Sequence, residues 1–423
     1  MPEITEKEAL LLKRVEADFQ ECVDFTKEFV DIESTRRNEE KAQSFVERTM
    51  RGLEMEVDKW IPELAPICVK FPKFIIDRQT FEGSPNVVGV KKGCGGGRSL
   101  LLNGHVDVVD PGNANWTTPP FKADIRDGKL YGRGSTDMKG GTAAYIHVLG
   151  CLQKLGYRLK GDIILESVVE EETGSLGTLS CGLRGYKADA AIIAEPTDLK
   201  VYPASVGVLW LDIEVEGLNA HGGTRHMGVS AIEKSFTVCN VLAELERFLA
   251  AEYRHPLYTD AELPYSINVG MINSGIQRTI VPGQATLGVR MPIIPGDSVE
   301  ETQNRLEKWI GEAASRDPWL CDHVPKITYR NVWSAGNTPV DHPIVQMCVD
   351  SYRSVQAAEP VICGALFTTD SGPMWDSSQT PSVIFGPGTG ERAHKVDEFI
   401  ELDKWLEYCK MLALMITRWC GIK

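Results

Sequence analysis

The sequence predicts an α/β protein in which a central mixed sheet flanked by helices carries an inserted α+β domain. Apolar, strand-like runs alternate with helical stretches up to about residue 205, and this alternation is typical of an α/β domain. Beyond that point the strands become amphipathic, as in antiparallel sheets with one exposed face. The chain has 423 residues, which exceeds the length at which one hydrophobic core usually keeps growing. We therefore expect two domains.

The N-terminal part begins with a helical pattern. From about residue 6 to residue 32, apolar side chains recur at helical spacing, so we expect one amphipathic helix there. Two apolar runs, residues 86–90 and 99–102, flank a glycine-rich segment at residues 91–97. This arrangement predicts a β-hairpin whose second strand leads directly into His105.

Three further segments complete the first part of the chain. A helical stretch from residue 140 to residue 156 ends on glycine, as helices often do. Residues 162–169 and 190–194 are apolar runs typical of strands, and they lead into Glu170-Glu171-Glu172 and Glu195, respectively. Because an open α/β sheet places its chemistry at strand ends, these glutamates are candidate site residues.

The middle of the chain follows a β-α-β-β-α-β order. The expected elements are a strand at 209–216, a helix at 231–251, strands at 265–272 and 285–294, a helix at 299–314 and a strand at 326–332. This order predicts a ferredoxin-like insertion over residues 206–334. Residues 1–205 and 335–423 would form the other domain, since the late segment supplies His394.

Composition and charge narrow the function. The formal net charge of −14 argues against nucleic acid or an anionic membrane as a partner, so we expect a small-molecule substrate. The eleven cysteines are scattered and form no Cys-x-x-Cys pair, which indicates reduced thiols and a cytoplasmic protein. The polar, acidic start has no signal-peptide core, and no run approaches the length of a membrane span.

Five side chains that can bind metals lie at the ends of predicted strands or in glycine-rich turns. They are His105, Asp137, Glu172, Glu195 and His394. Two imidazoles and three carboxylates, with Glu171 to spare, are the groups that a two-metal hydrolase needs. If one glutamate of the triplet binds a metal, its neighbour can take a proton from bound water.

Each motif also has a plainer interpretation. His105 and Asp107 share one face of an extended segment and could be a satisfied polar pair. Asp137, in a turn with four glycines, could cap the following helix. The Glu170–Glu172 triplet could be a solvated acidic loop, although three adjacent carboxylates repel one another and need a positive partner. Glu195 could belong to a simple turn, and His394 could be a surface histidine.

In this order, the motifs resemble those of the M20 metallopeptidases, especially the acetylornithine deacetylase and succinyl-diaminopimelate desuccinylase branch. The matching segments are His105-Val106-Asp107, the glycine-rich turn around Asp137, Glu171-Glu172-x-Gly-Ser, Glu195-Pro196 and Gly386-Pro387-Gly388 with His394. The resemblance covers nearly the whole chain. It implies a Zn-exopeptidase-like catalytic domain and an inserted lid domain through which two copies form a homodimer.

The resemblance implies which residues hold two divalent metal ions. His105, Asp137 and Glu195 would bind one ion. Asp137, Glu172 and His394 would bind the other, so that Asp137 bridges the pair. The expected metal is zinc, with cobalt and manganese as alternatives because carboxylate-rich sites also accept them.

The resemblance also implies the catalytic groups around the metals. Glu171 would be the general base and then the general acid, and Asp107 would support His105. Family members often have a cis peptide bond after the bridging aspartate, so we expect one between Asp137 and Met138.

Two lid residues match motifs of the same family. His221, in Ala220-His221-Gly222-Gly223, would reach into the partner subunit's site to stabilise an oxyanion, although it could instead be a turn residue. Arg290 would bind a substrate carboxylate, or it could be an exposed strand arginine. The chain departs from the family at Thr279, where many members have asparagine, and at Asp370-Ser371-Gly372, where relatives often have Asp-Ala-Arg or Asp-Gly-Arg.

We therefore expect a metal-dependent amidohydrolase that removes an acetyl, formyl or succinyl group from an N-acyl amino acid or a related small amide. Within the same family, the alternatives are a dipeptidase or carboxypeptidase and an N-formyl-aminopyrimidine deformylase. Outside it, a metal-binding regulator without catalysis is disfavoured by the intact Glu171. A phosphoesterase is disfavoured because the sequence has no Walker-type glycine loop.

Overall fold

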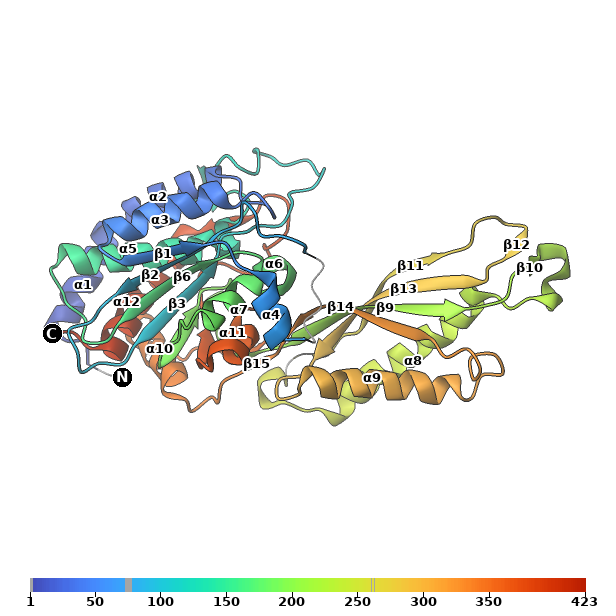
Figure 1. Cartoon of the computed structure of the whole chain (residues 1–423). Helices are drawn as coiled ribbons and strands as arrows, with labels where there is room; N and C mark the ends of the chain where they lie inside the picture. The colour runs from blue at the N-terminus through green and yellow to red at the C-terminus, as the bar shows by residue number, and fades with distance from the viewer. Residues whose placement is uncertain (1–2, 73–77, 260, 262) are drawn as a thin grey trace.

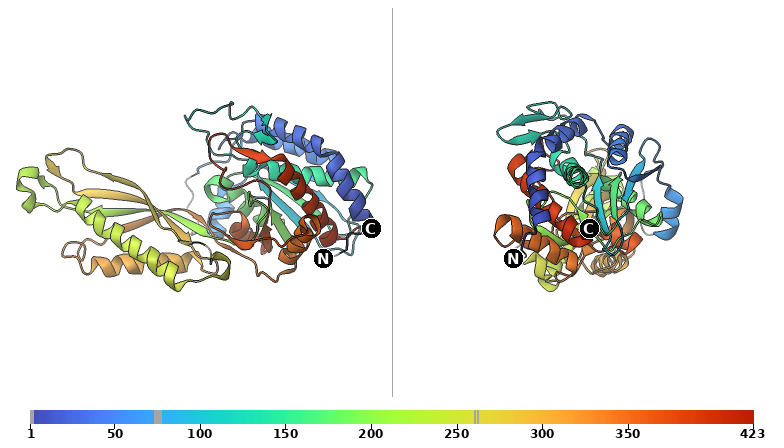
Figure 2. Two further views of the ribbon diagram at one scale, coloured as in Figure 1. Left: turned by 180° about the vertical axis from the view of Figure 1, so that it is seen from behind. Right: turned by 90° about the vertical axis from the view of Figure 1, so that its left-hand side faces the viewer.

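The computed structural model describes residues 3–72, 78–259, 261 and 263–423, and it has a larger and a smaller lobe (Figures 1 and 2). The elements from β9 to β14 form the smaller lobe. Those before β9 and after β14 form the larger lobe, so the chain leaves it once and returns to it. Within the part of the chain described, no helix combines the length and the apolar character that crossing a membrane requires.

The predicted N-terminal helix is interrupted at Asp18. Helix α1 (Glu6–Ala17) ends there and α2 (Phe19–Asp31) begins directly after it. The Asp18 carboxylate lies 3.1 Å from the guanidinium of Arg14 and 2.7 Å from the ammonium of Lys154, so it ties the break to helix α5. The prediction of one continuous helix is wrong at this residue.

A mixed sheet forms the centre of the larger lobe, as the sequence predicts. Its strand order is β1-β2-β6-β3-β7-β17-β8-β15, and β16 also pairs with β8. The strands are β1 (Glu56–Trp60), β2 (Asn86–Lys91), β3 (Leu100–His105), β6 (Ile163–Val168), β7 (Ala190–Ile193), β8 (Val201–Ser205), β15 (Gly336–Asn337), β16 (Ile362–Ala365) and β17 (Ser382–Ile384). Strand β3 is parallel to β6 and β7, whereas β2 is antiparallel to β6.

The predicted hairpin of β2 and β3 is wrong, because β6 lies between these strands. The glycine-rich connection packs instead against distant backbone. A Cβ atom on Gly93 would lie 2.3 Å from the carbonyl oxygen of Lys160, and one on Gly97 would lie 2.0 Å from that of Cys420. These glycines therefore permit close backbone approach and do not form a two-strand turn.

Helices cover both faces of the large sheet. They are α3 (Glu40–Gly52), α4 (Leu64–Lys70), α5 (Gly140–Lys154), α6 (Glu171–Gly174), α7 (Leu176–Leu183), α10 (Pro343–Gln356), α11 (Ser371–Ser378) and α12 (Leu402–Cys420), and α5 confirms the helix predicted over 140–156. Leu100 and Leu102 of β3 pack in the core that contains α5 and α12. Leu101 packs in a second core with residues of α7 and α11. A strand buried on both faces carries a continuous apolar run, as β3 does over Leu100–Leu102 before its polar end at Asn103 and His105.

The smaller lobe has the predicted β-α-β-β-α-β order. Its elements are β9 (Gly207–Glu216), α8 (Ala231–Glu252), β11 (Asn268–Ser274), β13 (Gln284–Ile293), α9 (Val299–Ala314) and β14 (Lys326–Trp333). The antiparallel order β11-β13-β9-β14 is that of a ferredoxin-like sheet. The short strands β10 (Ala220–His221) and β12 (Ile280–Val281) pair at the end of this lobe that points away from the large sheet (Figure 1).

Candidate metal centre

The predicted site residues meet at one edge of the large sheet. His105 is the last residue of β3, and Glu195 lies just beyond the end of β7. Glu171 and Glu172 begin helix α6, which follows β6. Because β3, β6 and β7 are parallel neighbours, their carboxyl ends lie side by side.

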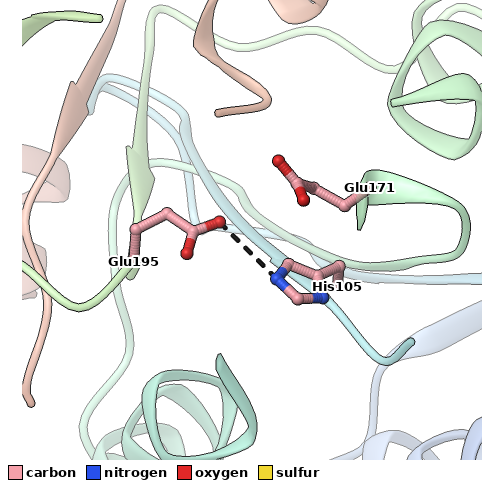
Figure 3. A group of neighbouring side chains, drawn as sticks. All are labelled: His105, Glu171 and Glu195. Carbon is pink, nitrogen blue, oxygen red and sulfur yellow. Dashed lines mark ion pairs between the residues drawn. The ribbon is translucent and has the colours of Figure 1, made fainter. Parts of the chain in front are cut away.

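Asp137 lies between the two histidines. Its Oδ1 atom is 3.1 Å from Nε2 of His105, and its Oδ2 atom is 3.2 Å from Nε2 of His394. Glu195 approaches His105 on the same nitrogen, at 3.6 Å (Figure 3). Glu172 lies 3.0 Å from Nε2 of His394. The structure therefore brings all five predicted ligands together, with one oxygen of Asp137 facing each imidazole.

Two sets of donor atoms lie close enough to share a cation. Atoms of His105, Asp137 and Glu172 fall within 4.8 Å of one another, and so do atoms of His105, Glu171 and Glu195. These sets differ from the two expected from the resemblance, in which Glu171 binds no metal. Imidazole nitrogen and carboxylate oxygen are donors that zinc and similar divalent ions accept, so the residues fit such ions.

The charges of the cluster also fit a cation. Burial alone would lower the pKa of His105, but the hydrogen bond to Asp137 and the charge of Glu195 raise it well above its ordinary value. Burial raises the pKa of Glu195 and of Glu171 well above that of a free glutamate. Hydrogen bonds to two carboxylates raise the pKa of His394 to about 10. Crowded carboxylates of this kind are stabilised in their charged form by nearby positive charge.

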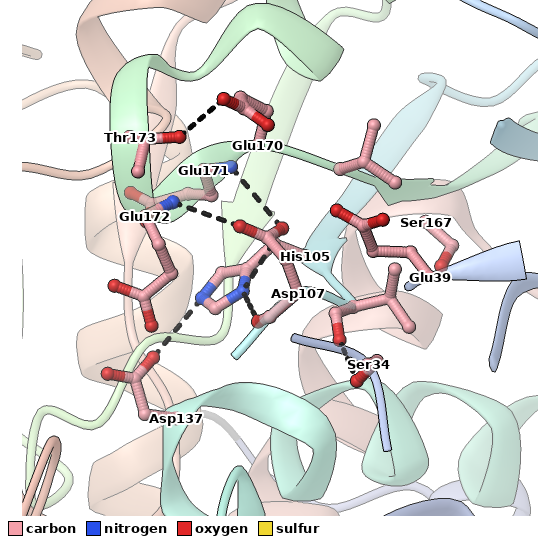
Figure 4. A network of polar contacts seen from close by, with 12 residues as sticks. Ser34, Glu39, His105, Asp107, Asp137, Ser167, Glu170, Glu171, Glu172 and Thr173 are labelled. Atoms are coloured by element: carbon pink, nitrogen blue, oxygen red, sulfur yellow. Dashed lines mark hydrogen bonds and ion pairs between the residues drawn. The ribbon is translucent and has the colours of Figure 1, made fainter. Parts of the chain in front are cut away.

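Asp107 connects His105 to helix α6 (Figure 4). The ring nitrogen Nδ1 of His105 donates to the main-chain oxygen of Asp107 at 2.8 Å. This bond fixes the imidazole with Nε2 toward the cluster. The Asp107 carboxylate accepts from the backbone N–H groups of Glu171 and Glu172, at 3.3 and 3.1 Å. The backbone oxygen of Asp107 thus holds the His105 ring, and its carboxylate, 3.8 Å from Nδ1 of His105, also holds α6.

The three adjacent glutamates have different surroundings. Glu170 is fully buried and contacts two guanidinium groups, those of Arg36 and Arg78. It also accepts a hydrogen bond from Oγ1 of Thr173 at 2.6 Å (Figure 4). The triplet is therefore no solvated loop. Sequence reasoning required a positive partner but could not find these arginines, which lie 134 and 92 positions away.

A second residue that sequence reasoning missed is Glu398. One of its oxygens accepts from the backbone N–H groups of Thr136 and Asp137, at 3.0 and 3.1 Å. The other lies 2.6 Å from Nη1 of Arg133. This buried pair fixes the backbone on which Asp137 stands. Arg133 belongs to the glycine-rich motif, but no local pattern marks Glu398. The expected cis peptide bond between Asp137 and Met138 is present.

The two lid candidates lie in different places. Arg290 of β13 lines a cavity of about 340 Å³ that Asp137, Glu171 and His394 also line. Its Nη1 donates to the main-chain oxygen of Ser266 at 3.2 Å, and burial lowers its pKa. His221 lies exposed at the end of the lid, where its Nδ1 accepts from a backbone N–H. One chain therefore brings Arg290, but not His221, to the cluster.

The larger lobe is a mixed α/β domain with histidines and carboxylates at its strand ends, and it lies next to a ferredoxin-like lid. This combination of fold and site is typical of metal-dependent hydrolases. The chain belongs to the peptidase family M20/M25/M40, whose model matches residues 101–418. It is an amidohydrolase, and the enzymes of this family use divalent metal ions. These findings confirm the resemblance read from the sequence.

Several known proteins resemble most or nearly all of the chain. The N-formyl-4-amino-5-aminomethyl-2-methylpyrimidine deformylase of Bacillus subtilis (strain 168) is 29% identical to it, over 98% of each chain. The acetylornithine deacetylase of Myxococcus xanthus is 30% identical, over 79% of this chain and 84% of its own. Among solved structures, the di-peptidase Dug1p from Saccharomyces cerevisiae has a TM-score of 0.74 at 14% identity and covers 98% of both chains. The last likeness concerns the fold.

Proposed function

We propose that the protein is a two-metal N-deacylase that removes a small acyl group from a small N-acyl compound. The observation that carries this proposal is the position of Asp137, whose two oxygens face two different imidazoles beside the buried Glu171. We assign His105, Asp137 and Glu195 to one ion. Asp137, Glu172 and His394 are assigned to the other.

Zinc is the proposed metal, with cobalt and manganese as alternatives, because nitrogen and carboxylate donors accept all three. When bound, such a pair of ions lowers the pKa of a shared water and polarises an amide carbonyl. Metal analysis of protein purified without added ions tests this assignment. A preparation that is fully active with magnesium alone would contradict it.

Glu171 is the proposed general base. It is buried at the cluster, and its raised pKa suits a group that takes a proton and later returns it. Glu171 would accept a proton from the attacking water and then donate it to the leaving amine nitrogen. Asp107 would keep Glu171 in place through its hydrogen bond to the backbone of α6.

A homodimer formed through the lid is also proposed. Strand β11 lies at the edge of the lid sheet and carries the exposed apolar side chains of Met271 and Ile272. An exposed apolar edge strand is a surface on which a second copy can pair. In such a dimer His221 of one subunit would donate to the oxyanion formed in the other.

The protein is also proposed to be cytoplasmic. The cysteines are all free, which fits a reducing compartment such as the cytoplasm.

Mixing two inactive variants tests this arrangement. A chain with His221→Ala retains Glu171, and a chain with Glu171→Gln retains His221. If His221 acts on the partner's site, the mixed dimer has one complete site. After random exchange of subunits, about a quarter of the wild-type rate should return, since half of the dimers are mixed and each has one working site. No recovery in dimers known to have exchanged would contradict the proposal.

An assay of amine release identifies the acyl group and the amine of the substrate. Zinc-loaded and cobalt-loaded protein is incubated with N-formyl, N-acetyl and N-succinyl compounds, including the formylated aminopyrimidine and acetylornithine, and with dipeptides. We expect amine release from a formyl or acetyl compound, because the two relatives act on such groups. Cleavage of dipeptides alone would indicate a peptidase. Absence of all cleavage by fully metallated protein would favour a regulator, and phosphodiester cleavage a phosphoesterase.

A further inference from the structure

We propose that the amine half of the substrate is a planar aromatic or heteroaromatic ring, held between Trp210 of the lid and Phe367 of the larger lobe. This inference rests on the proposed deacylase function and names its substrate class. Both side chains line the cavity that also contains Glu171, Glu195 and His394. Its volume of about 340 Å³ is at the small end for ligand sites, which favours a single ring with a short acyl group.

Trp210 occupies an unusual position for a large aromatic side chain. Strand β9 alternates buried and more exposed residues, and Trp210 is on the exposed side, with 39% of its surface accessible. Large indoles are mostly buried in folded proteins, so an accessible one inside a cavity beside a reaction centre marks a binding surface.

Trp333 keeps the ring of Trp210 in place. The two ring centroids are 5.0 Å apart at an interplanar angle of 59°. Trp333 is almost fully buried, and its indole N–H donates to the main-chain oxygen of Glu171 at 3.2 Å. The aromatic surface is therefore fastened to the backbone of the proposed base, which sets the distance between a stacked ring and the reacting bond.

Phe367 contributes from the other lobe. It follows β16, is half-buried and packs edge-on against Tyr202, with ring centroids 6.2 Å apart. Because Trp210 and Phe367 belong to different lobes and line the same cavity, one flat ligand can contact both. A flexible aliphatic amine gains little from two aromatic walls, whereas a ring can stack on one wall and meet the other at its edge.

Arg290 adds a polar group beside this aromatic surface. It is directly opposite Trp210 in the pairing of β13 with β9. Arginine has five N–H donors in a planar fork, and one of them bonds to Ser266. A ring nitrogen or a carboxylate at the edge of the bound ring would be a suitable acceptor. A ring that carries such an acceptor would therefore bind more tightly than the same ring without it.

A pair of matched substrates tests the inference. N-Formylbenzylamine and N-formyl(cyclohexylmethyl)amine have the same atoms around the amide, but only the first has a flat ring. We expect kcat/KM to be roughly tenfold higher for the aromatic compound, the value of a good aromatic contact. Equal kcat/KM for the pair, or cleavage of other N-acyl compounds without cleavage of N-formylbenzylamine, would overturn the inference. If no N-acyl compound is cleaved, the proposed function itself fails.

Variants of the two walls provide a second test. Trp210→Leu and Phe367→Leu should each raise KM for the aromatic compound by roughly threefold, so that the two walls together account for the tenfold preference, and leave the cyclohexyl compound almost unchanged. Trp210→Phe should retain the preference. Trp375→Leu is the matched control, because this exposed tryptophan of α11 lies outside the cavity. An equal loss for both compounds in Trp210→Leu, with thermal unfolding unchanged, would overturn the assignment of that wall.

Discussion

The two histidines of the candidate metal centre lie in contrasting surroundings. His105 ends a buried strand, has 1% of its side chain exposed, and is fixed through Nδ1 by a backbone oxygen. His394 lies on a loop with positive φ and has 53% of its side chain exposed. The metal centre thus has a buried half, around His105 and Glu195, and an open half, around His394 and Glu172.

The comparison teaches how the site is held together. The buried half is positioned by parallel strands and by buried hydrogen bonds, so its donors are in place before any ion binds. In the open half, His394 is held by its contacts with Asp137 and Glu172, which are themselves proposed metal ligands. We therefore expect the buried half to bind its ion more tightly, and the open half to depend on the ion for its order.

The largest effect should come from Glu171 in the buried half. Glu171→Gln should lower kcat by roughly 10²–10⁴-fold, because the proposed base would be lost. The metal content should remain that of the wild type, since the assigned ligands are intact. Turnover on a cleaved N-acyl substrate and elemental analysis check both parts. Near-normal turnover would show that Glu171 is not the base, and loss of an ion would show that it is a ligand.

A large effect on stability should follow from Arg78→Met. This change leaves the buried Glu170 carboxylate without one of its two guanidinium partners. Breaking a buried ion pair typically costs about 3–5 kcal/mol, and urea unfolding measures the loss. Arg184→Met is the matched control, because Arg184 pairs with Asp58 at the surface, where such pairs contribute about 1 kcal/mol or less. If both variants lost the same free energy of unfolding, the buried pair of Arg78 and Glu170 would contribute no more than a surface pair.

The position of each residue along the chain explains what the sequence could predict. His105, Glu172 and Glu195 lie at or just beyond the ends of parallel strands, and such ends meet at one edge of a sheet, so their convergence could be foreseen. Arg78 and Glu398 could not be foreseen, because each lies far along the chain from the residue that it holds. These partners depend on tertiary packing, which leaves no local pattern.

Two errors in the predicted elements have the same origin, because distant contacts decide the local structure. Residues 93–97 have the composition of a hairpin turn, yet Gly93 and Gly97 permit close packing against residues 160 and 161. Asp18 lies within an unbroken helical pattern and still ends α1, and its carboxylate bonds to a lysine of a different helix. His221 is a different case, since its proposed partner is a second chain and a single chain leaves it at the end of the lid.

Removal of the metal ions should distinguish the buried half of the site from the open half. We expect a chelator to remove ions in two phases, the open half first, and to lower the thermal stability. An ion present at 100 times its dissociation constant stabilises the folded state by about 2.7 kcal/mol, and this contribution is lost on removal. Timed chelation with elemental analysis follows the stoichiometry. Release of both ions in a single phase would contradict a difference between the halves.

The smallest effect on folding should come from the open half. His394→Ala removes an exposed side chain. The free energy of unfolding of this variant without metal should therefore stay within about 0.5 kcal/mol of the wild-type value. His105→Ala leaves buried oxygens of Asp107 and Asp137 without a partner, which costs about 1–3 kcal/mol. With metal, His394→Ala should retain one ion per chain and release it in one phase, because the donors of the buried half remain. If the two alanine variants were equally stable and bound equal numbers of ions, the division of the site into a buried and an open half would be wrong.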